Sequence, residues 1–487
     1  MPRTPVAHAV AAVLTALLLL PATAVGQATA PDAAEPTGAE ATGSTPAPVT
    51  VQPPPPGPSQ PRQRTVGGQL AALRDTGLIT PEAHDAAAAR YADARRTRAR
   101  LTGRRRVELT AVLATVEAVT RRGELTASRV PLAFETLERN RQWWTTGALL
   151  AYGARTTFPG SELVWQSYPG QGIQVQWLGT FGRANALFSG GKRYDERLRE
   201  LVDEALALAA ARAGGLAFES WFTFDGGRPP WVSALSQGTA LQAISRAGSR
   251  LAEPRHLDAA RSALGIFRTA PPAGVRVKTP AGAHYLQYSF APKLRIVNGF
   301  VQALNGLHDF GELADSATGR ALFAAGDAQL RTELPRADTG AWSRYAVGGN
   351  ESDLGYHRLL RDFLRGLCER SGTGLYCQTA TRFTADLTRP PALRLLAPAA
   401  PPRQGKSTRV AFTLDKVSVV SLVVTRAGAP IFSRTARVPR GRSAFALPRL
   451  RRAGALELRL RATDLAGNAA SATGRLAVAA TPAAAKR

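Results

Sequence analysis

The hydrophobic periodicity of this chain changes near residue 389. Before that point, apolar residues recur at helical spacing, as in YDERLRELVDEALALAAARAGG (194–215) and LGYHRLLRDFLRGLCERSG (354–372). Beyond it they alternate with polar residues, as in STRVAFTLDK (407–416) and ALELRLRATDLAGN (455–468). Periods of about 3.6 and about 2 residues are typical of amphipathic helices and half-buried strands, respectively. The sequence therefore predicts a mainly α fold followed by a β domain.

Two helical regions are expected before the change. Residues 65–130 are predicted to form a helical hairpin, in which Thr80 and Pro81 start the first helix and Gly123 ends the second. Residues 131–388 alternate helical runs with aromatic loops rich in Gly and Pro. This pattern predicts an α/α toroid, an incomplete barrel of helical hairpins whose loops at one rim form a carbohydrate-sized cleft.

Residues 389–480 are predicted to form a small immunoglobulin-like β-sandwich, because turn residues separate the alternating runs at intervals of about eight to twelve residues. The DLAGNAA segment (464–470) is typical of the final-strand turn of such bacterial domains. We interpret this domain as an accessory or adhesion module. Residues 481–487 are expected to be a disordered tail.

The N-terminus predicts export. Residues 1–26 have a basic start, an apolar run from Ala9 to about Leu20 and a cluster of small residues, the pattern of a secretory signal peptide. Residues 27–64 are rich in Pro and Ala and are predicted to be a disordered linker. We expect a secreted or cell-surface protein, associated with the envelope, with no membrane span after signal cleavage.

The chain is strongly basic. It has 62 Lys and Arg against 36 Asp and Glu, a net charge of +26. Such a surface favours polyanionic partners, namely nucleic acid, anionic lipid or acidic polysaccharide. The abundance of Arg and Ala is also what GC-rich coding produces, so charge alone does not identify the partner. Export and the lack of a recognition motif argue against nucleic acid.

The two cysteines, Cys368 and Cys377, are predicted to form a disulfide, because an exported protein meets an oxidising environment. The sequence contains no CxxC, HExxH, GxSxG or phosphate-loop motif, so we predict no metal and no cofactor. Three acidic residues, Asp338, Glu351 and Asp353, lie near one another, but their spacing is not diagnostic of a glycosidase.

Tyrosines in and beside the loops are better candidates for chemistry. Tyr285, Tyr288, Tyr345 and Tyr356 have basic neighbours in the sequence, which are His284, Arg295, Arg344, His357 and Arg358. Positive charge favours phenolate, so we expect these neighbours to ease tyrosine ionisation. Packing of the rings against the rim is the alternative interpretation.

Several of these segments resemble a known family. SALSQG (233–238), YSFAPKLRIVNGFVQALNGLHDF (288–310), LPRADTG (334–340) followed by Tyr345, and GYH (355–357) are similar to the C-terminal domain of D-glucuronyl C5-epimerases. These enzymes convert glucuronate to iduronate in heparan-type glycans. The resemblance covers roughly residues 165–370. It implies an α/α toroid, no cofactor, a possible homodimer and proton transfer at C5 of a uronic acid in an acidic polysaccharide.

The resemblance also implies roles for individual residues. Tyr288 and Tyr356 match the catalytic tyrosines of the family, and Tyr345 matches a further tyrosine of the site. The residues that we assign to substrate binding are Gln237, Gln287, Asn298, Arg344, His357 and Trp231.

The sequence departs from the family pattern at two positions. Gln287 stands where the family has a glutamate, and glutamine cannot exchange a proton. The arginine expected shortly after Tyr345 is replaced by Ala346, Val347 and two glycines, and Arg344 is a possible substitute.

Three functions stay open at this stage. The first is an isomerase, an exported uronate C5-epimerase. The second is a polysaccharide lyase, which shares the first step but expels the C4 substituent. The third is a non-catalytic protein that binds acidic glycans at the envelope.

Overall fold

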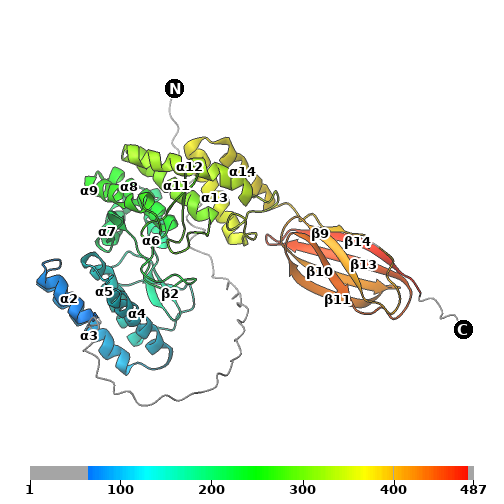
Figure 1. The fold of residues 1–487 in the computed structure, drawn as a ribbon, viewed down its shortest axis with the longest axis horizontal. Helices are drawn as coiled ribbons and strands as arrows, with labels where there is room; N and C mark the ends of the chain where they lie inside the picture. The colour runs from blue at the N-terminus through cyan, green and yellow to red at the C-terminus, as the bar shows by residue number, and fades with distance from the viewer. Residues whose placement is uncertain (1–63, 399, 481–487) are drawn as a thin grey trace, which may run out of the picture. The chain divides into compact units, whose positions relative to one another are not determined.

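A computed structural model describes residues 64–398 and 400–480 of the chain. The predicted signal peptide, most of the predicted linker and the predicted tail lie outside the described residues. The described chain divides into two compact units, residues 64–154 with 167–173, and residues 155–166 with 174–480. Helices make up most of it before residue 389 and strands make up most of it afterwards (Figure 1), so the mainly α class is confirmed.

The first unit is helical. Its helices are α2 (Val66–Asp75), α3 (Pro81–Arg100), α4 (Gly103–Arg121) and α5 (Val130–Thr146). The predicted start of α3 is confirmed, because the Thr80 hydroxyl accepts the Ala83 amide at 3.2 Å and Pro81 is the first helical residue. Gly123 follows α4 with φ +75°, a conformation that glycine adopts at little cost. The α3–α4 hairpin packs against α5, so it is part of a larger helical unit.

The second unit contains the remaining helices. They are α6 (Trp177–Ser189), α7 (Asp195–Ala207), α8 (Ala234–Leu251), α9 (Pro254–Ala263), α10 (Gly265–Arg268), α11 (Val297–Leu313), α12 (Ala317–Ala337), α13 (Leu354–Ser371) and α14 (Gly374–Asp386). Helix α11 packs against α8, α12 and α13. The α/α toroid predicted for residues 131–388, an incomplete barrel of helical hairpins, stays a prediction.

Helices α8 and α11 approach each other backbone to backbone. A Cβ on Gly238 would lie 2.5 Å from the Ala303 Cα, and one on Gly306 would overlap the Gly238 carbonyl oxygen. Both helices are buried on nearly every face over their first ten residues. The two glycines therefore set the closest contact in the helical core.

One predicted helix ends earlier than expected. The run 194–215 was expected to be helical up to Gly214, but α7 stops at Ala207 and β4 (Ala210–Arg212) pairs with β5 (Gly215–Ala217). The helical prediction for this end of the run is wrong because Ala213 and Gly214 both take positive φ, which makes a tight hairpin turn. Tertiary packing thus overrides the helix propensity of an alanine-rich segment.

Short strands complete the loops of this part of the chain. Strands β1 (Arg155–Thr156), β2 (Trp165–Tyr168) and β3 (Gly172–Val175) form one sheet in that order. Strands β6 (Arg276–Lys278) and β7 (Ala283–Tyr285) form an antiparallel hairpin that leads directly into the segment carrying Tyr288. The predicted disulfide is present, and it joins Cys368 of α13 to Cys377 of α14.

The C-terminal β region (394–480) contains two antiparallel sheets. One has the order β11-β10-β13-β14 and the other β12-β9-β8. Their strands are β8 (Arg394–Leu395), β9 (Thr408–Leu414), β10 (Ser418–Arg426), β11 (Ala429–Val438), β12 (Gly441–Leu447), β13 (Gly454–Asp464) and β14 (Ala469–Val478). Phe412 and Phe445 of one sheet and Leu422 and Leu460 of the other belong to a single buried core. The immunoglobulin-like topology stays a prediction.

A buried lysine bonds this β region to the end of the helices. The Lys416 side chain is 1% exposed, and its Nζ lies 3.0 Å from Asp464 Oδ2 and 3.0 Å from the Asp386 carbonyl oxygen. The Asn468 amide, in the β13–β14 turn, donates to the Leu387 carbonyl oxygen at 2.9 Å. The β9–β10 and β13–β14 turns are therefore fixed to the residues at and after the end of α14.

Replacing Lys416 tests this connection. Lys416→Met keeps much of the side-chain volume but leaves the Asp464 carboxylate buried without its cation. We expect the free energy of unfolding to fall by roughly 3–5 kcal/mol, measured by urea denaturation. Lys406→Met, at an exposed position of the same region, is the matched control and should change stability by less than about 0.5 kcal/mol. Equal stability of the two variants would contradict the role given to Lys416.

No helix within the described residues combines the length and the low polarity that crossing a bilayer requires.

Candidate functional site

The structure brings the three predicted tyrosines together. The Tyr345 side chain hydrogen-bonds to both Tyr288 and Tyr356. The rings of Tyr345 and Tyr356 meet edge to face with centroids 4.8 Å apart. We call Tyr288, Tyr345 and Tyr356 the tyrosine cluster. Three hydroxyl groups in contact can pass protons among themselves.

Backbone contacts place each member of the cluster. The Val297 amide, at the start of α11, donates to the Tyr345 carbonyl oxygen at 3.2 Å. The Asp353 carboxylate caps α13 by accepting the Tyr356 amide at 2.8 Å, so Tyr356 lies in the first turn of that helix. The Ser289 amide donates to the Val232 carbonyl oxygen at 3.0 Å, which ties the Tyr288 segment to the start of α8.

Aromatic rings surround Tyr288. Phe290 stacks on it with ring centroids 5.3 Å apart, and Phe224 and Trp231 lie within 5.4 and 5.7 Å. The Trp231 indole donates to the Phe222 carbonyl oxygen at 2.8 Å, which fixes the ring. Aromatic walls with a few polar groups are typical of small-molecule and sugar sites. The Trp231 ring therefore forms part of the aromatic wall around Tyr288, while its indole N–H bonds to the protein backbone.

Burial controls the acidity of the cluster. It raises the pKa of Tyr288 to about 12, and the neighbouring Tyr356 adds to the rise, while hydrogen bonds from Tyr345 and Gln287 oppose it. Burial also raises the pKa of Tyr345 far above the usual value for tyrosine. The expectation that basic neighbours would ease tyrosine ionisation is therefore wrong. Desolvation of the phenolate is the largest contribution at both residues.

The basic neighbours are engaged elsewhere. Arg344 donates to the Gly349 carbonyl oxygen at 2.5 Å, within the turn that follows Tyr345. Arg295 lies 4.0 Å from Glu333. Arg344 thus shapes the turn, and the structure does not show it reaching the tyrosine hydroxyls.

Gln287 and Asn298 carry free polar atoms beside Tyr288. The Gln287 amide nitrogen donates to the Tyr288 hydroxyl at 2.9 Å, but its Oε1 has no hydrogen-bond partner among the described residues. Asn298 Nδ2 also has no hydrogen-bond partner among the described residues, while Asn298 Oδ1 accepts the Gly299 amide at 2.8 Å. Both side chains are about 95% buried or more. Buried polar atoms are normally paired, so a free acceptor and a free donor here point to a polar ligand.

Two predicted substrate-binding residues have structural roles instead. Gln237 is buried, and its amide bonds the Phe218 amide and the Leu216 and Ala263 carbonyl oxygens. It therefore holds the segment after β5 against α8. His357 is fully buried, and its Nδ1 accepts the Ser343 amide at 3.1 Å.

The second ring nitrogen of His357 is also occupied. Its Nε2 lies 3.0 Å from the Phe383 carbonyl oxygen, and because Nδ1 accepts a backbone amide, the proton belongs on Nε2. The ring stacks on Trp342 with centroids 3.8 Å apart. Burial lowers the pKa of His357 to about 4, so the ring is neutral. His357 therefore holds α13 in place, and both of its ring nitrogens are occupied by protein groups, so neither is available to a sugar.

The three carboxylates noted in the sequence are structural. Asp338 pairs with Arg382 at 2.8 Å, and Asp353 caps α13. Glu351 accepts the Val417 amide of the β region at 2.8 Å, and burial raises its pKa. Glu351 thus joins the turn after Tyr345 to the C-terminal β region.

One member of the basic set beside the tyrosines, His284, forms an ion pair that the sequence did not predict. His284 Nδ1 lies 2.7 Å from Glu333 of α12, and both side chains are buried. Glu333 also lines a cavity of about 450 Å³ together with Arg295, Arg336 and Val347. The helical periodicity of the α12 segment could have placed Glu333, but nothing in the sequence pairs it with His284.

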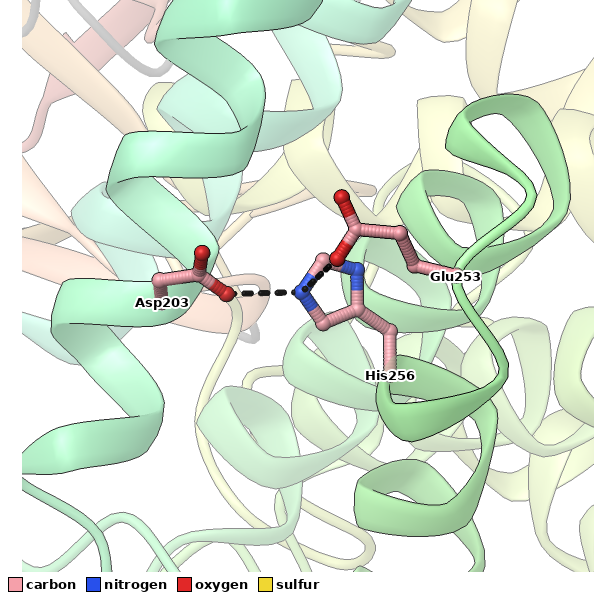
Figure 2. Close-up of side chains that lie close together, drawn as sticks. All are labelled: Asp203, Glu253 and His256. Carbon is pink, nitrogen blue, oxygen red and sulfur yellow. Dashed lines mark hydrogen bonds and ion pairs between the residues drawn. The ribbon is translucent and has the colours of Figure 1, made fainter.

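A second cluster of ionisable groups lies between α7 and α9. Figure 2 shows His256 between Asp203 and Glu253, and its Nε2 is 2.8 Å from the Asp203 carboxylate. These three groups are close enough to hold a metal ion. However, Arg255 pairs with both carboxylates and Arg199 pairs with Glu253. The arginines already neutralise the acids, so the cluster is best described as an ion-pair network.

The chain was compared with known proteins. Residues 216–385 match the family described as D-glucuronyl C5-epimerase C-terminus, and this range contains the whole tyrosine cluster. A D-glucuronyl C5-epimerase of Caenorhabditis elegans is 31% identical over 130 residues, which cover 24% of this chain and 21% of that protein. An uncharacterized protein of Methanocaldococcus jannaschii is 26% identical over 151 residues, covering 30% and 49%. The chain thus spans a fifth to a half of the length of these relatives.

Similarity to solved structures is low. The endo-β-1,4-glucanase CMCax of Acetobacter xylinum aligns with a TM-score of 0.32 and 15% identity, over 48% of this chain and 72% of that one. A fold cannot be assigned from this value.

The matched range is mainly helical and holds the whole tyrosine cluster. Residues 216–385 belong to the D-glucuronyl C5-epimerase C-terminal family.

Proposed function

We propose that the chain is an exported C5-epimerase-like protein that acts on uronate residues of an extracellular or cell-envelope polysaccharide. The observation that carries this proposal is the tyrosine cluster, in which Tyr345 bonds both Tyr288 and Tyr356 inside the family-matched range. The signal-like residues 1–26 support export, and the excess of arginine supports an acidic substrate.

The chemistry requires a base and an acid. The C5 hydrogen of a uronate is α to a carboxylate and only weakly acidic, so its removal needs a positioned base and stabilisation of the enolate that forms. Inversion then requires a proton delivered to the opposite face of C5. Asn298 Nδ2 is a buried donor without a protein partner among the described residues, and we assign it to the uronate carboxylate.

The cluster can supply both proton transfers and reset itself. A Tyr288 phenolate takes the C5 proton, and the Tyr356 hydroxyl then gives its proton to the other face. Tyr288 is now protonated and Tyr356 is a phenolate. Because Tyr345 hydrogen-bonds to both, its hydroxyl can give a proton to Tyr356 while it takes one from Tyr288. The cluster thus returns to its starting charge, and exchange of its hydroxyl protons with deuterated water between turnovers places deuterium at C5.

Gln287 limits this reaction. The cluster must lose one proton before it can act as a base, and burial opposes that loss. A carboxylate at position 287 could take up the proton of the Tyr288 hydroxyl, whereas the Gln287 amide, which donates a hydrogen bond to that hydroxyl, cannot act as a base. The active phenolate is therefore a minor form at neutral pH.

Tyrosine-to-phenylalanine changes test the cluster. Tyr288→Phe, Tyr345→Phe and Tyr356→Phe each keep the ring and remove the hydroxyl. We expect each to slow C5 hydrogen–deuterium exchange in a uronate polymer roughly 10²–10⁴-fold, measured by NMR in deuterated water. Tyr285→Phe is the control, because the Tyr285 hydroxyl is buried but bonds the Leu322 carbonyl oxygen outside the cluster. Exchange that survives in the Tyr288 and Tyr356 variants would refute the site.

The pH profile tests the base. Since the deprotonated Tyr288 is the active form and its pKa is about 12, its fraction rises about tenfold for each pH unit below that value. We expect kcat/KM for C5 exchange to rise with this slope between about pH 7 and pH 9. A plateau beginning below pH 8 would show that another group is the base.

Gln287→Glu tests the departure from the family. The new carboxylate can take the Tyr288 proton, so we expect faster exchange at pH 7, by roughly tenfold or more, and a shallower pH profile. Gln378→Glu, at an exposed position of α14 outside the cluster, is the control. No gain in the Gln287 variant would mean that the glutamine does not limit proton transfer.

A non-catalytic glycan-binding role is the second candidate, and Gln287 is the observation that favours it. It predicts binding of uronate polymers with no C5 exchange in the natural protein at any pH. A lyase would be recognised in the same NMR experiment by an unsaturated uronate product.

A further inference from the structure

The C-terminal β region carries half of the net charge of the chain. Residues 394–480 contain 16 Lys and Arg against 3 Asp and Glu, a net charge of +13 out of +26. Two of the three acids are engaged, because Asp464 pairs with the buried Lys416 and Asp415 accepts the Ala392 amide. The charge of this region is therefore almost entirely uncompensated.

Several of these arginines share one face of the four-stranded sheet. In β13 the residues Leu456, Leu458 and Leu460 are buried, so Arg459 and Arg461, which alternate with them, face outward. The register of the neighbouring strands adds Arg475 of β14 and Arg437 of β11 to the same side. We call Arg437, Arg459, Arg461 and Arg475 the arginine face. Its strands β11, β10, β13 and β14 are neighbours in the sheet (Figure 1).

Small side chains, most of them hydroxyls, separate these arginines. Arg461 lies opposite Ser421 on one side and Ser471 on the other, Arg459 lies opposite Val423 and Thr473, and Arg437 lies opposite Val419. The acidic residue on this face is Glu457, opposite Arg475. Neighbouring strands are about 4.8 Å apart and alternate residues of one strand about 6.7 Å apart, so the face presents a spaced array of cations and hydroxyls.

The arginines of this face lack the ion pairs that are common in the helices. Within the described part of the chain, none of the four has a carboxylate within 4 Å. By contrast, Arg212, Arg246 and Arg370 of the helical part each pair with a buried or nearly buried acid. Like charges gathered without counter-charges are unfavourable until an anion binds.

We propose that the arginine face binds an acidic polysaccharide at a site separate from the tyrosine cluster. Planar guanidinium groups bind carboxylate and sulfate groups bidentately, and Ser and Thr hydroxyls can bond sugar hydroxyls. A flat array of such groups matches an extended polymer with repeated anions. The inference shares its ligand class with the proposed function but rests on the register and charge of this sheet alone.

Binding at a second site has a consequence for polymers. A chain held on the β region raises the local concentration of its other uronate residues around the helical domain. A short oligosaccharide that occupies only the tyrosine cluster gains nothing from it. The arginine face would therefore lower KM for a polymer and leave kcat unchanged.

The test measures binding of the full chain to polyglucuronate, with neutral dextran as the blank. In Arg459→Gln/Arg461→Gln we expect Kd to rise about tenfold, and wild-type binding to weaken between about 50 and about 500 mM NaCl. Arg409→Gln/Arg442→Gln is the matched control, because it removes two exposed charges from the opposite sheet. We expect Kd in the control to change less than about twofold. Dextran sulfate in place of polyglucuronate distinguishes sulfate from carboxylate recognition.

Two kinds of result would overturn the proposal. Equal losses in the two double variants would mean that net charge, and not this face, drives binding. The protein could instead bind phosphatidylglycerol vesicles or duplex DNA more tightly than polyglucuronate, and lose that binding in Arg459→Gln/Arg461→Gln. Such a result would assign the face to a membrane or to nucleic acid. Binding is measured without turnover, so the two proposals can fail separately. If the natural protein shows no C5 exchange but Arg459→Gln/Arg461→Gln weakens its binding, the proposed function is refuted and this inference stands.

Discussion

The close contact of α8 and α11 is the constraint on which the site depends. Gly238 and Gly306 allow the two backbones to touch, and any side chain at either position would push the helices apart. The start of α11 carries Asn298 and bonds the Tyr345 carbonyl oxygen through Val297. The start of α8 is tied to the Tyr288 segment. A glycine contact in the core therefore fixes the separation of the two loops whose tyrosines meet.

The site that results is governed by burial more than by charge. A chain with a net charge of +26 would be expected to stabilise phenolates, yet the arginines near the tyrosine cluster bond backbone or acids. The cluster is left in a desolvated, aromatic setting that favours neutral hydroxyls. Neutral hydroxyls in such a setting lose their protons reluctantly, so the proposed reaction depends on the step that creates the phenolate. Position 287 matters in the proposed mechanism because its side chain contacts the Tyr288 hydroxyl that must lose a proton.

Sequence and structure agree where short-range patterns decide the outcome. The start of α3, the disulfide and most strands of the β region follow from local signals, and the motif resemblance named the three tyrosines that the structure brings together. Strand β11 was not recognised, because it is an edge strand with most residues exposed and little alternation. The end of α7 was misplaced because a hairpin turn at Ala213 overrode helix propensity.

Sequence patterns could not predict which groups the polar side chains bond. Gln237 and His357 lie in matching motifs, but their polar atoms bind the backbone, and only three-dimensional contacts show this. Lys416 ends an alternating run with no sequence signal of burial, and it is buried against Asp464. The β region, interpreted as an accessory module, is joined through Glu351 and Val417 to the turn that follows Tyr345.

The most direct test of the central claim is approach to equilibrium from both epimers in deuterated water. Polymers rich in glucuronate and polymers rich in iduronate would be incubated separately with the protein, and the C5 configuration and deuterium content followed by NMR. The account predicts deuterium at C5 in both cases, no chain cleavage, and the same final epimer ratio from either side. Retention of both starting configurations with no deuterium at C5 would contradict it.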